Sequence, residues 1–226
     1  MKTLIIIPAY NEEGSIVKTV DSLIEKMPAI DYIIINDGSS DGTEMLCKAH
    51  GYNVISLSIN LGLTGGFQTG MKYAYSNNYD AALQFDADGQ HRPDYVQPLI
   101  DAMGETNADI VIGSRFAKKD KHLFFRLIGS SLISAMIKIT TGKWIQDPTS
   151  GMRLYNKKMI EIFATKHDIA PEPDTLAYFI RKGLKTVEVP VKMQERFAGK
   201  SYLSVSRSVS YMLRTCISIL ILQWFR

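Results

Sequence analysis

The sequence predicts an α/β fold in which helices flank a mostly parallel central sheet. Short apolar runs alternate with helical patterns through the first half of the chain, and short polar segments connect them. Such alternation is typical of βαβ units, whose strands run parallel. Polar residues directly follow four of the five apolar runs. Ligands bind at the carboxyl ends of such strands, so we expect a functional site at that edge.

The expected strands are short apolar runs, and the expected helices carry apolar residues on one face. The first helix places Ile16, Val20 and Leu23 at helical spacing, and Ser39-Ser40-Asp41 supplies N-cap residues for the second. The strands are expected at residues 4–7, 32–36, 53–57, 81–85 and 109–113. The first helix is expected at residues 13–26, and the second runs from Asp41 toward His50. The third follows a glycine-rich loop at residues 60–66 and ends near Tyr75, and the fourth is expected at residues 93–103.

The chain changes character after Arg115. A long apolar helical pattern covers residues 123–140. A loop is expected at Asp147-Pro148-Thr149-Ser150-Gly151, and an edge strand at residues 188–191. The tail from residue 204 is helical and ends in an apolar run. We therefore expect one α/β domain over residues 1–202 and a C-terminal amphipathic helical segment over residues 203–226.

Composition excludes several classes of protein. The chain has 226 residues, 46% of them hydrophobic, which is ample for a buried core. A net charge of +3 gives no argument for nucleic acid but is compatible with an anionic substrate or membrane surface. Two cysteines are too few for a disulfide framework, and the first apolar run is too short for a signal peptide. A cytoplasmic location is expected.

Asp86-Ala87-Asp88-Gly89-Gln90 carries the most informative chemistry. It places oxygen ligands at the end of an apolar strand, and Mg²⁺ and Mn²⁺ prefer oxygen. A metal bound there would neutralise a diphosphate leaving group. The alternative is that the aspartates only cap the next helix, as many short Asp-x-Asp motifs do.

Six ordered motifs follow the expected strands and loops. They are Pro8-Ala9-Tyr10-Asn11-Glu12-Glu13, Asn36-Asp37-Gly38-Ser39-Ser40-Asp41-Gly42-Thr43, Asn60-Leu61-Gly62, Asp86-Ala87-Asp88-Gly89-Gln90, Gly113-Ser114-Arg115 and Asp147-Pro148-Thr149-Ser150-Gly151-Met152-Arg153. In this order they resemble the motifs of the family-2 glycosyltransferases, and within them the polyprenyl-phosphate sugar transferases that are similar to dolichol-phosphate-mannose synthase. The resemblance covers residues 3 to about 200 and implies a Rossmann-like glycosyltransferase-A fold.

The resemblance implies roles for individual residues. The expected metal ligands, for Mg²⁺ or Mn²⁺, are Asp86, Asp88 and Gln90. The expected catalytic residues are Asp88, Arg115, Asp147 and Arg196. The expected nucleotide-sugar-binding residues are Pro8, Ala9, Tyr10, Glu12, Asp37, Gly65, Asp86, Ala87, Asp88, Arg115, Arg196 and Lys200.

Chemistry supports some of these roles and leaves alternatives for others. A carboxylate at Asp37 suits a base N–H, and the fork of arginine suits phosphate oxygens. Asp147 is equally compatible with fixing its own loop, and the glycines near Gly65 with a backbone that needs positive φ. The late motif of the subgroup, Arg-x-x-Gly-x-Ser-Lys, has Tyr202 here in place of its lysine, and Lys200 is the expected substitute.

The C-terminal segment is expected to lie on a membrane. Its apolar run spans about nine residues, far fewer than the ~20 that cross a bilayer, and arginines and aromatic residues flank it. The alternative is a helix docked on the sheet or in a dimer interface. Many relatives carry transmembrane helices after the catalytic domain, and no such helix is expected in this sequence. The resemblance is therefore to the short bacterial members, which work on undecaprenyl phosphate beside a small integral membrane protein.

Together these features predict metal-dependent, inverting transfer of a sugar from a nucleotide-sugar to polyprenyl phosphate for cell-surface glycan assembly. The enzyme is expected on the inner face of the cell membrane. UDP-linked glucose or N-acetylglucosamine is favoured, with GDP-mannose as an alternative. A glycan acceptor is a second alternative, and a non-catalytic sugar-nucleotide-binding or scaffold protein a third.

Overall fold

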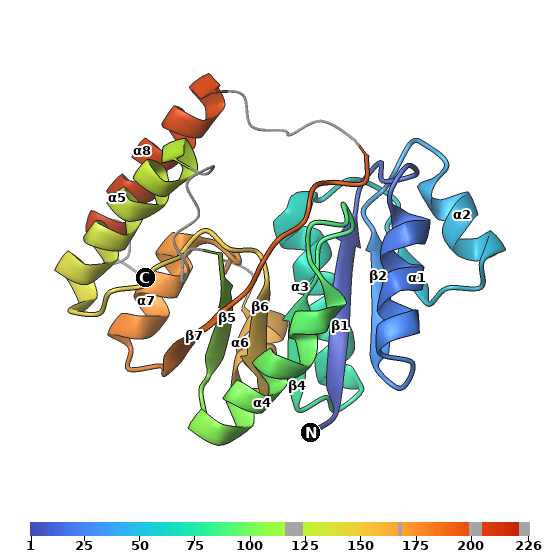
Figure 1. Cartoon of the computed structure of the whole chain (residues 1–226), viewed down its shortest axis with the longest axis horizontal. Helices are drawn as coiled ribbons and strands as arrows, with labels where there is room; N and C mark the ends of the chain where they lie inside the picture. Colours follow the sequence, from blue (N-terminus) through green and yellow to red (C-terminus); the bar gives the residue numbers. More distant parts are fainter. Residues whose placement is uncertain (116–123, 167–168, 199–204, 222–226) are drawn as a thin grey trace.

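The computed structural model describes residues 1–115, 124–166, 169–198 and 205–221, without the side chains of residues 124–128 and 205–209. A seven-stranded sheet in the order β3-β2-β1-β4-β6-β5-β7 forms the centre of this part of the chain (Figure 1). Its strands are β1 (Thr3–Ala9), β2 (Asp31–Asn36), β3 (Val54–Ser56), β4 (Ala81–Gln84), β5 (Ile110–Ser114), β6 (Arg153–Asn156) and β7 (Thr186–Pro190).

The sheet is parallel except for one strand. β1 pairs in parallel with β2 and β4, and β5 with β7, whereas β6 runs antiparallel between β4 and β5. β5 therefore has the same direction as β4, and the carboxyl ends of β1, β2, β4 and β5 meet at one edge. The α/β class, the mostly parallel sheet, the five early strands and the edge position of β7 are confirmed.

Helices cover both faces of the sheet (Figure 1). They are α1 (Ile16–Lys26), α2 (Thr43–Ala49), α3 (Gly62–Ser76), the 3₁₀ turn η1 (Pro93–Tyr95), α4 (Val96–Thr106), α5 (Phe124–Thr141), α6 (Lys157–Thr165), α7 (Pro173–Arg181) and α8 (Val205–Leu220). Because successive strand residues face opposite sides, β1 contributes to two cores. Leu4 and Ile6 pack with Phe67 of α3, whereas Ile5 and Ile7 pack with Val20 of α1.

Two predictions about the chain path need correction. The glycine-rich segment 60–66 is not a loop throughout, because α3 already begins at Gly62. A Cβ at Gly70 would lie 2.3 Å from a methyl carbon of Ile6, so glycine lets this helix pack closely on β1. The strand β6 and the helices α6 and α7 were not expected.

The C-terminal helix α8 docks by one face on α5 and α7. Ile219 is fully buried, the Tyr211 hydroxyl donates to Glu172, and the Ser218 hydroxyl donates to Asp174 at 2.6 Å. The alternative weighed for this segment was a helix docked on the sheet or in a dimer interface, whereas α8 docks on two helices of the same chain. Trp224, Phe225 and Arg226, which were expected to anchor the segment on a membrane, lie outside the described residues.

Candidate active site

The loops after β1 and β2 are joined by reciprocal hydrogen bonds. Asn11 adopts a left-handed conformation (φ 55°), its N–H donates to Ser39 Oγ at 3.0 Å, and its side-chain oxygen accepts from the Ser40 N–H at 2.8 Å. The Glu12 N–H donates to Thr43 Oγ1 at 2.8 Å. These bonds bring the first two predicted motifs side by side. Of the predicted nucleotide-binding residues here, Pro8 and Ala9 end β1, and Tyr10 is exposed.

Asp37 is buried at the end of β2 and fixes the turn that precedes α3. Its Oδ1 accepts from the Leu61 N–H at 2.8 Å, and its carbonyl accepts from the Asn60 side chain at 3.1 Å. The expected base-binding carboxylate therefore also has a structural role. Gly65 lies in the first turn of α3, and a Cβ there would come within 2.4 Å of Leu61 Cβ. Close packing accounts for this glycine, and its nucleotide contact stays a prediction.

The segment after β4 is held from both sides. The Ala87 carbonyl accepts from Thr19 Oγ1 of α1 at 2.9 Å, and both partners are buried. Asp88 is also buried, and its Oδ1 accepts from the Gln90 N–H at 2.9 Å across a turn at Gly89 (φ 83°). The two predicted metal ligands Asp88 and Gln90 are thereby brought to the same point.

Arg196 lies against these two ligands. Its Nε is 3.1 Å from Asp88 Oδ2 and 3.2 Å from Gln90 Oε1. Its segment is tied down by backbone bonds from the Phe197 N–H to the Asp88 carbonyl at 3.0 Å and from the Gln194 N–H to the Gln90 carbonyl at 3.1 Å. The structure therefore brings Arg196 to the site from a segment more than 100 residues away in the sequence.

The oxygens of Asp88 and Gln90 fit a hard divalent cation. Both already point at one cationic atom, the Nε of Arg196. Within the described residues, no three His, Cys, Asp or Glu side chains form a cage for a metal ion. Mg²⁺ sites of this class use one or two carboxylates and complete their shell with substrate phosphates and water, so such a cage is not required.

Glu12 lies in the electrostatic field of this segment. Burial raises the pKa of Glu12 above its ordinary value. The Ser15 hydroxyl lowers this pKa by donating to the carboxylate, while the nearby charge of Asp88 raises it again. The predicted nucleotide-binding carboxylate of Glu12 therefore interacts electrostatically with the predicted metal ligand Asp88.

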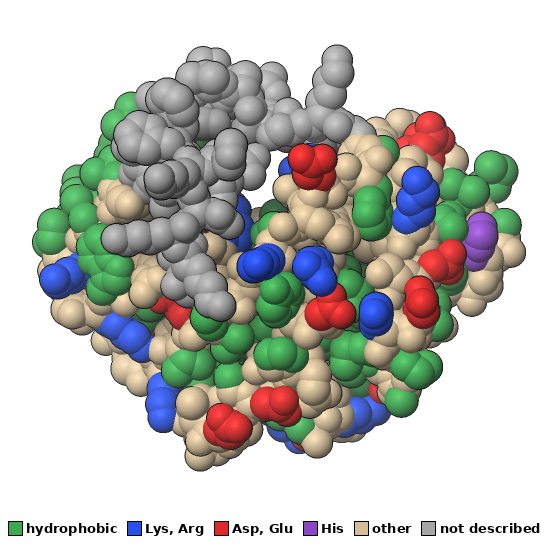
Figure 2. All heavy atoms as spheres, in the orientation of Figure 1, with side chains coloured by type: hydrophobic (Ala, Val, Ile, Leu, Met, Phe, Trp, Pro, Cys, Tyr) green, Lys and Arg blue, Asp and Glu red, His purple; other side chains and the backbone are tan. Residues whose placement is uncertain are grey.

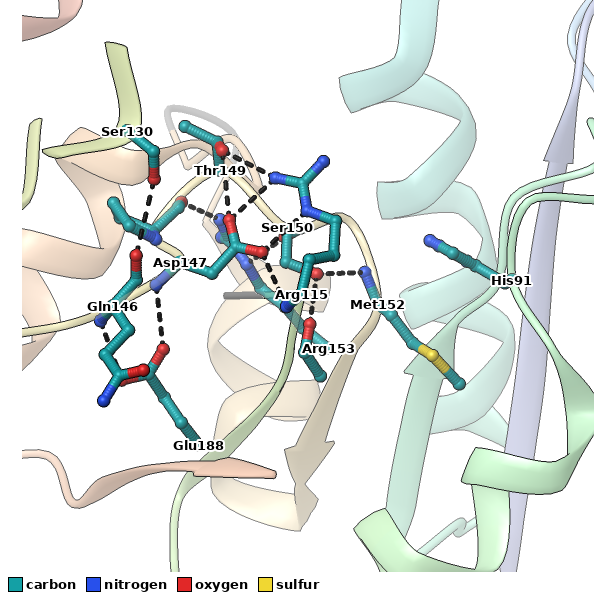
Figure 3. Close-up of polar contacts among 12 residues, drawn as sticks. His91, Arg115, Ser130, Gln146, Asp147, Thr149, Ser150, Met152, Arg153 and Glu188 are labelled. Carbon is teal, nitrogen blue, oxygen red and sulfur yellow. Dashed lines mark hydrogen bonds and ion pairs between the residues drawn. The ribbon is translucent and has the colours of Figure 1, made fainter. Parts of the chain in front are cut away.

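Arg115 and Asp147 form a second charged pair, shown in Figure 3. The buried Asp147 carboxylate accepts from Arg115 Nε and Nη2, each at 2.7 Å, and from the Arg115 N–H at 3.0 Å. Such bidentate pairs are strong and geometrically specific. Glu188 of β7 orders the chain behind them by accepting from the backbone N–H groups of Gln146 at 2.8 Å and Asp147 at 2.9 Å. Asp147 thus holds Arg115 in place.

A buried arginine fixes the loop that carries Asp147. Arg153 donates to the carbonyls of Pro148 at 2.6 Å and Ser150 at 2.8 Å. A Cβ at Gly151 of the same loop would lie 3.1 Å from Asp86 Oδ2. The loop therefore links the Arg115 pair to the Asp86 segment, and both belong to one site.

No role was predicted for several residues of this site. His91, Glu188, Arg153 and Gln194 all bond to predicted site residues or their loops. His91 directly follows Gln90 at the end of the Asp86–Gln90 motif, and Arg153 is the last residue of the motif that begins at Asp147. These positions were the only signals for the two residues. Lys200, the proposed substitute for the missing lysine, lies outside the described residues.

The mostly parallel sheet, with helices on both faces and acidic and arginine side chains at its carboxyl edge, has the layout of the glycosyltransferase-A class. Residues 4–163 match the family described as Glycosyl transferase family 2. The chain therefore belongs to glycosyltransferase family 2 and is a glycosyltransferase.

Relatives of known name agree with this assignment. The chain is 28% identical to polyprenol monophosphomannose synthase of Mycolicibacterium smegmatis, covering 91% of this chain and 82% of that protein. It is 30% identical to undecaprenyl-phosphate mannosyltransferase of Micrococcus luteus, covering 90% and 88%. It is also 30% identical to UDP-N-acetylglucosamine–dolichyl-phosphate N-acetylglucosaminyltransferase of Methanococcus voltae, covering 83% and 84%.

A solved structure shares the fold. Glucosyl-3-phosphoglycerate synthase from Mycobacterium tuberculosis, in complex with phosphoglyceric acid, superposes with a TM-score of 0.72 at 18% identity, covering 97% of this chain and 80% of that one. The same synthase in complex with Mn²⁺ and UDP-glucose gives a TM-score of 0.68. The expected glycosyltransferase-A fold is confirmed.

Proposed function

We propose that this glycosyltransferase moves one hexose or N-acetylhexosamine from a nucleotide-sugar to polyprenyl phosphate in a metal-dependent, inverting reaction. The observation that carries the proposal is that two arginine–carboxylate pairs, Asp88–Arg196 and Asp147–Arg115, lie on segments at the carboxyl edge of the sheet. Arginine forks next to a cation site suit a diphosphate. The three named relatives support a polyprenyl, undecaprenyl or dolichyl phosphate acceptor.

The proposed site has two sides. The loops of Glu12 and Asp37 would hold the nucleoside, and Asp88 with Gln90 would hold Mg²⁺ or Mn²⁺. The metal would supply positive charge that stabilises the departing diphosphate. Arg115, preset by Asp147, and Arg196 would contact phosphate oxygens. Asp86 would lie between nucleotide and metal.

The pairing of the acidic residues favours a phosphate acceptor over a sugar hydroxyl. A sugar hydroxyl needs a general base, for which the predicted catalytic residues Asp147 and Asp88 would be the candidates. Both carboxylates are paired with arginines. A lipid phosphate is already anionic, so its oxygen needs no base and attacks the anomeric carbon as the diphosphate leaves. A single in-line displacement of this kind inverts the configuration and gives a β-linked product from an α-linked donor.

For the donor, UDP-glucose and UDP-N-acetylglucosamine are favoured. The fold neighbour solved with UDP-glucose and the M. voltae relative support a UDP donor. GDP-mannose is the second candidate, because two relatives are named for mannose or phosphomannose transfer.

A panel of these three donors with Mn²⁺ and synthetic undecaprenyl phosphate tests the proposal. Radiolabel from one donor is expected in the organic phase, and Asp88→Asn is expected to abolish the transfer. Label that enters only water-soluble oligosaccharide would overturn the lipid acceptor and favour the glycan alternative. No transfer from any of the three donors, to undecaprenyl phosphate or to an oligosaccharide, would overturn the proposal itself.

We also propose that α5 and α8 seat the enzyme on the inner face of a membrane, where its product would feed cell-surface glycan assembly. The outer face of α8 carries Leu213, Ile217, Leu220 and Ile221 at helical spacing, each between 41 and 58% exposed. Figure 2 shows hydrophobic side chains along the left margin, where α5 and α8 lie in Figure 1. No described helix is long and apolar enough to cross a bilayer. An apolar face next to cationic side chains such as the exposed Arg214 suits an anionic lipid surface.

Flotation with vesicles of phosphatidylglycerol and phosphatidylethanolamine tests this surface. Ile217→Asn is expected to reduce binding severalfold, because it removes buried apolar area on the lipid side. Met45→Gln is the control, since Met45 is 68% exposed on α2 at the opposite end of the sheet. Equal flotation of both variants with the wild type would exclude this face and favour a protein partner, such as a small integral membrane protein.

A further inference from the structure

His91 is a buried imidazole whose two nitrogens both face one residue. Its Nδ1 accepts from the backbone N–H of Asp86 at 2.8 Å. Its Nε2 lies 3.4 Å from Asp86 Oδ2. The ring is 3% exposed and packs edge-to-face on Phe85 at a centroid distance of 5.5 Å. His91 therefore has little freedom to turn away from Asp86.

The backbone bond fixes the chemistry of this imidazole. A nitrogen that accepts a hydrogen bond carries no proton, so Nδ1 is unprotonated and the neutral ring carries its hydrogen on Nε2. That hydrogen is on the side of the Asp86 carboxylate. The same ring thus anchors the backbone of Asp86 and provides a donor to its side chain.

Asp86 is confined on its other sides as well. Its Oδ1 accepts from Gln84 Nε2 at 3.3 Å. On another side lies Gly151, where an added Cβ would be only 3.1 Å from Asp86 Oδ2. The Asp86 side chain is nevertheless 36% exposed. A carboxylate that is open to solvent on one side and has three defined neighbours is held in one orientation while a ligand can still reach it.

We propose that His91 is the positioning residue of Asp86 and sets the orientation in which this carboxylate meets the nucleotide and its metal. The inference rests on the proposed function, in which Asp86 lies between these two groups. Partners that orient a ligating carboxylate typically change metal affinity or activity 10- to 100-fold when they are lost. His91 acts through Asp86 and has no part of its own in the reaction.

Two substitutions separate the two contacts of the ring. In His91→Asn, the amide oxygen takes the place of Nδ1 and keeps an acceptor for the Asp86 N–H, but nothing reaches the carboxylate. In His91→Gln, the amide N–H₂ takes the place of Nε2 and keeps the donor to the carboxylate, but the backbone acceptor is lost. Thermal unfolding reports the backbone contact, and calorimetric affinity for Mn²⁺ with UDP or GDP reports the orientation of the carboxylate.

Each variant is expected to lose one of the two properties and to keep the other. His91→Asn should melt near the wild type but bind the metal–nucleotide pair about tenfold more weakly. His91→Gln should melt at a lower temperature but recover most of the affinity, with the remaining loss seen in KM more than in kcat. Affinity that follows the melting temperature in both variants would show a purely structural role and overturn the proposal.

A crystal structure of ligand-free His91→Asn gives a test that needs no donor. Asp86 is expected in more than one rotamer there and in a single rotamer in the wild type. An unchanged single rotamer in the variant would overturn the role of His91, whatever the enzyme transfers. Failure of wild-type protein to bind Mn²⁺ with either nucleotide would instead count against the proposed function.

Discussion

Replacing Arg196 by glutamine is expected to tighten Mn²⁺ binding to the nucleotide-free protein about fivefold. The Nε of Arg196 lies 3.1 Å from Asp88 Oδ2 and 3.2 Å from Gln90 Oε1, so a metal ion that uses both oxygens must displace it. A charge-assisted hydrogen bond contributes about 1.5–3 kcal/mol when it is buried. The Arg196 side chain is 31% exposed, and a solvent-screened pair contributes less. We therefore take about 1 kcal/mol as the cost of displacement, which corresponds to the fivefold change.

Electron paramagnetic resonance of free Mn²⁺ measures this affinity directly. The control is Lys192→Gln, which removes one positive charge from an exposed position on the same segment. With UDP or GDP present, the sign should reverse in Arg196→Gln, because the proposed diphosphate contact is lost. Equal Mn²⁺ affinity in Arg196→Gln and Lys192→Gln would refute the competition, and so would weaker Mn²⁺ binding in Arg196→Gln alone.

Three further substitutions, one of them with a matched control, test the stability of the site and of the sheet that carries it. Glu12→Gln should raise the free energy of unfolding at pH 7 by less than about 1 kcal/mol, because the side chain is partly exposed to solvent. The raised pKa of Glu12 makes its ionised form costly in the native state, so the gain should vanish below the ordinary pKa of 4.5, and an equal gain at pH 7 and pH 4 would contradict this. Asp147→Asn should lower the free energy of unfolding in urea by about 3 kcal/mol, because it leaves Arg115 largely buried without its carboxylate; a loss below about 1 kcal/mol would show that solvent screens the pair. Gly70→Ala should lower the free energy of unfolding by about 1–3 kcal/mol, because the added Cβ forces α3 away from β1. The control Gly104→Ala lies in a helix with open space around the new Cβ and should raise it by about 0.5 kcal/mol. Equal effects of the two substitutions would show that the contact of Gly70 does not limit packing.

The early strands and the residues at their carboxyl ends were predictable because the signals are local. An apolar run followed by Asp86-Ala87-Asp88 predicts both a strand and the polar residues at its carboxyl end. The parallel pairing of β1 with β2 and β4 then brings the carboxyl ends of these strands together. The strand β6 was not predictable in this way. Its sequence, Arg153-Leu154-Tyr155-Asn156, contains no apolar run, and its place between β4 and β5 becomes visible only in the antiparallel pairing with these two strands.

The partners of the site residues were hidden for a related reason. Glu188 and Asp147 are 41 residues apart in the sequence. Glu188 contacts the loop of Asp147 because β7, which carries Glu188, pairs with β5. An isolated glutamate in an expected edge strand gives no sign of such a role. The beginning of α3 was missed because glycines usually indicate loops, whereas here Gly65 and Gly70 are required by close packing inside a helix.

The two arginines of the site differ in how firmly they are held, and this difference has a consequence for ligand binding. Arg115 bonds through its backbone N–H and its guanidinium to a fully buried carboxylate, whose loop is fixed in turn by Glu188 and Arg153. Arg196 is held by a longer contact to Asp88 on a segment fixed mainly by backbone bonds. Of the two, Arg196 is the one that contacts both proposed metal ligands, Asp88 and Gln90. Arrival of the metal–diphosphate pair should therefore leave Arg115 in place as a preorganised contact and move Arg196 from the metal ligands onto the phosphates.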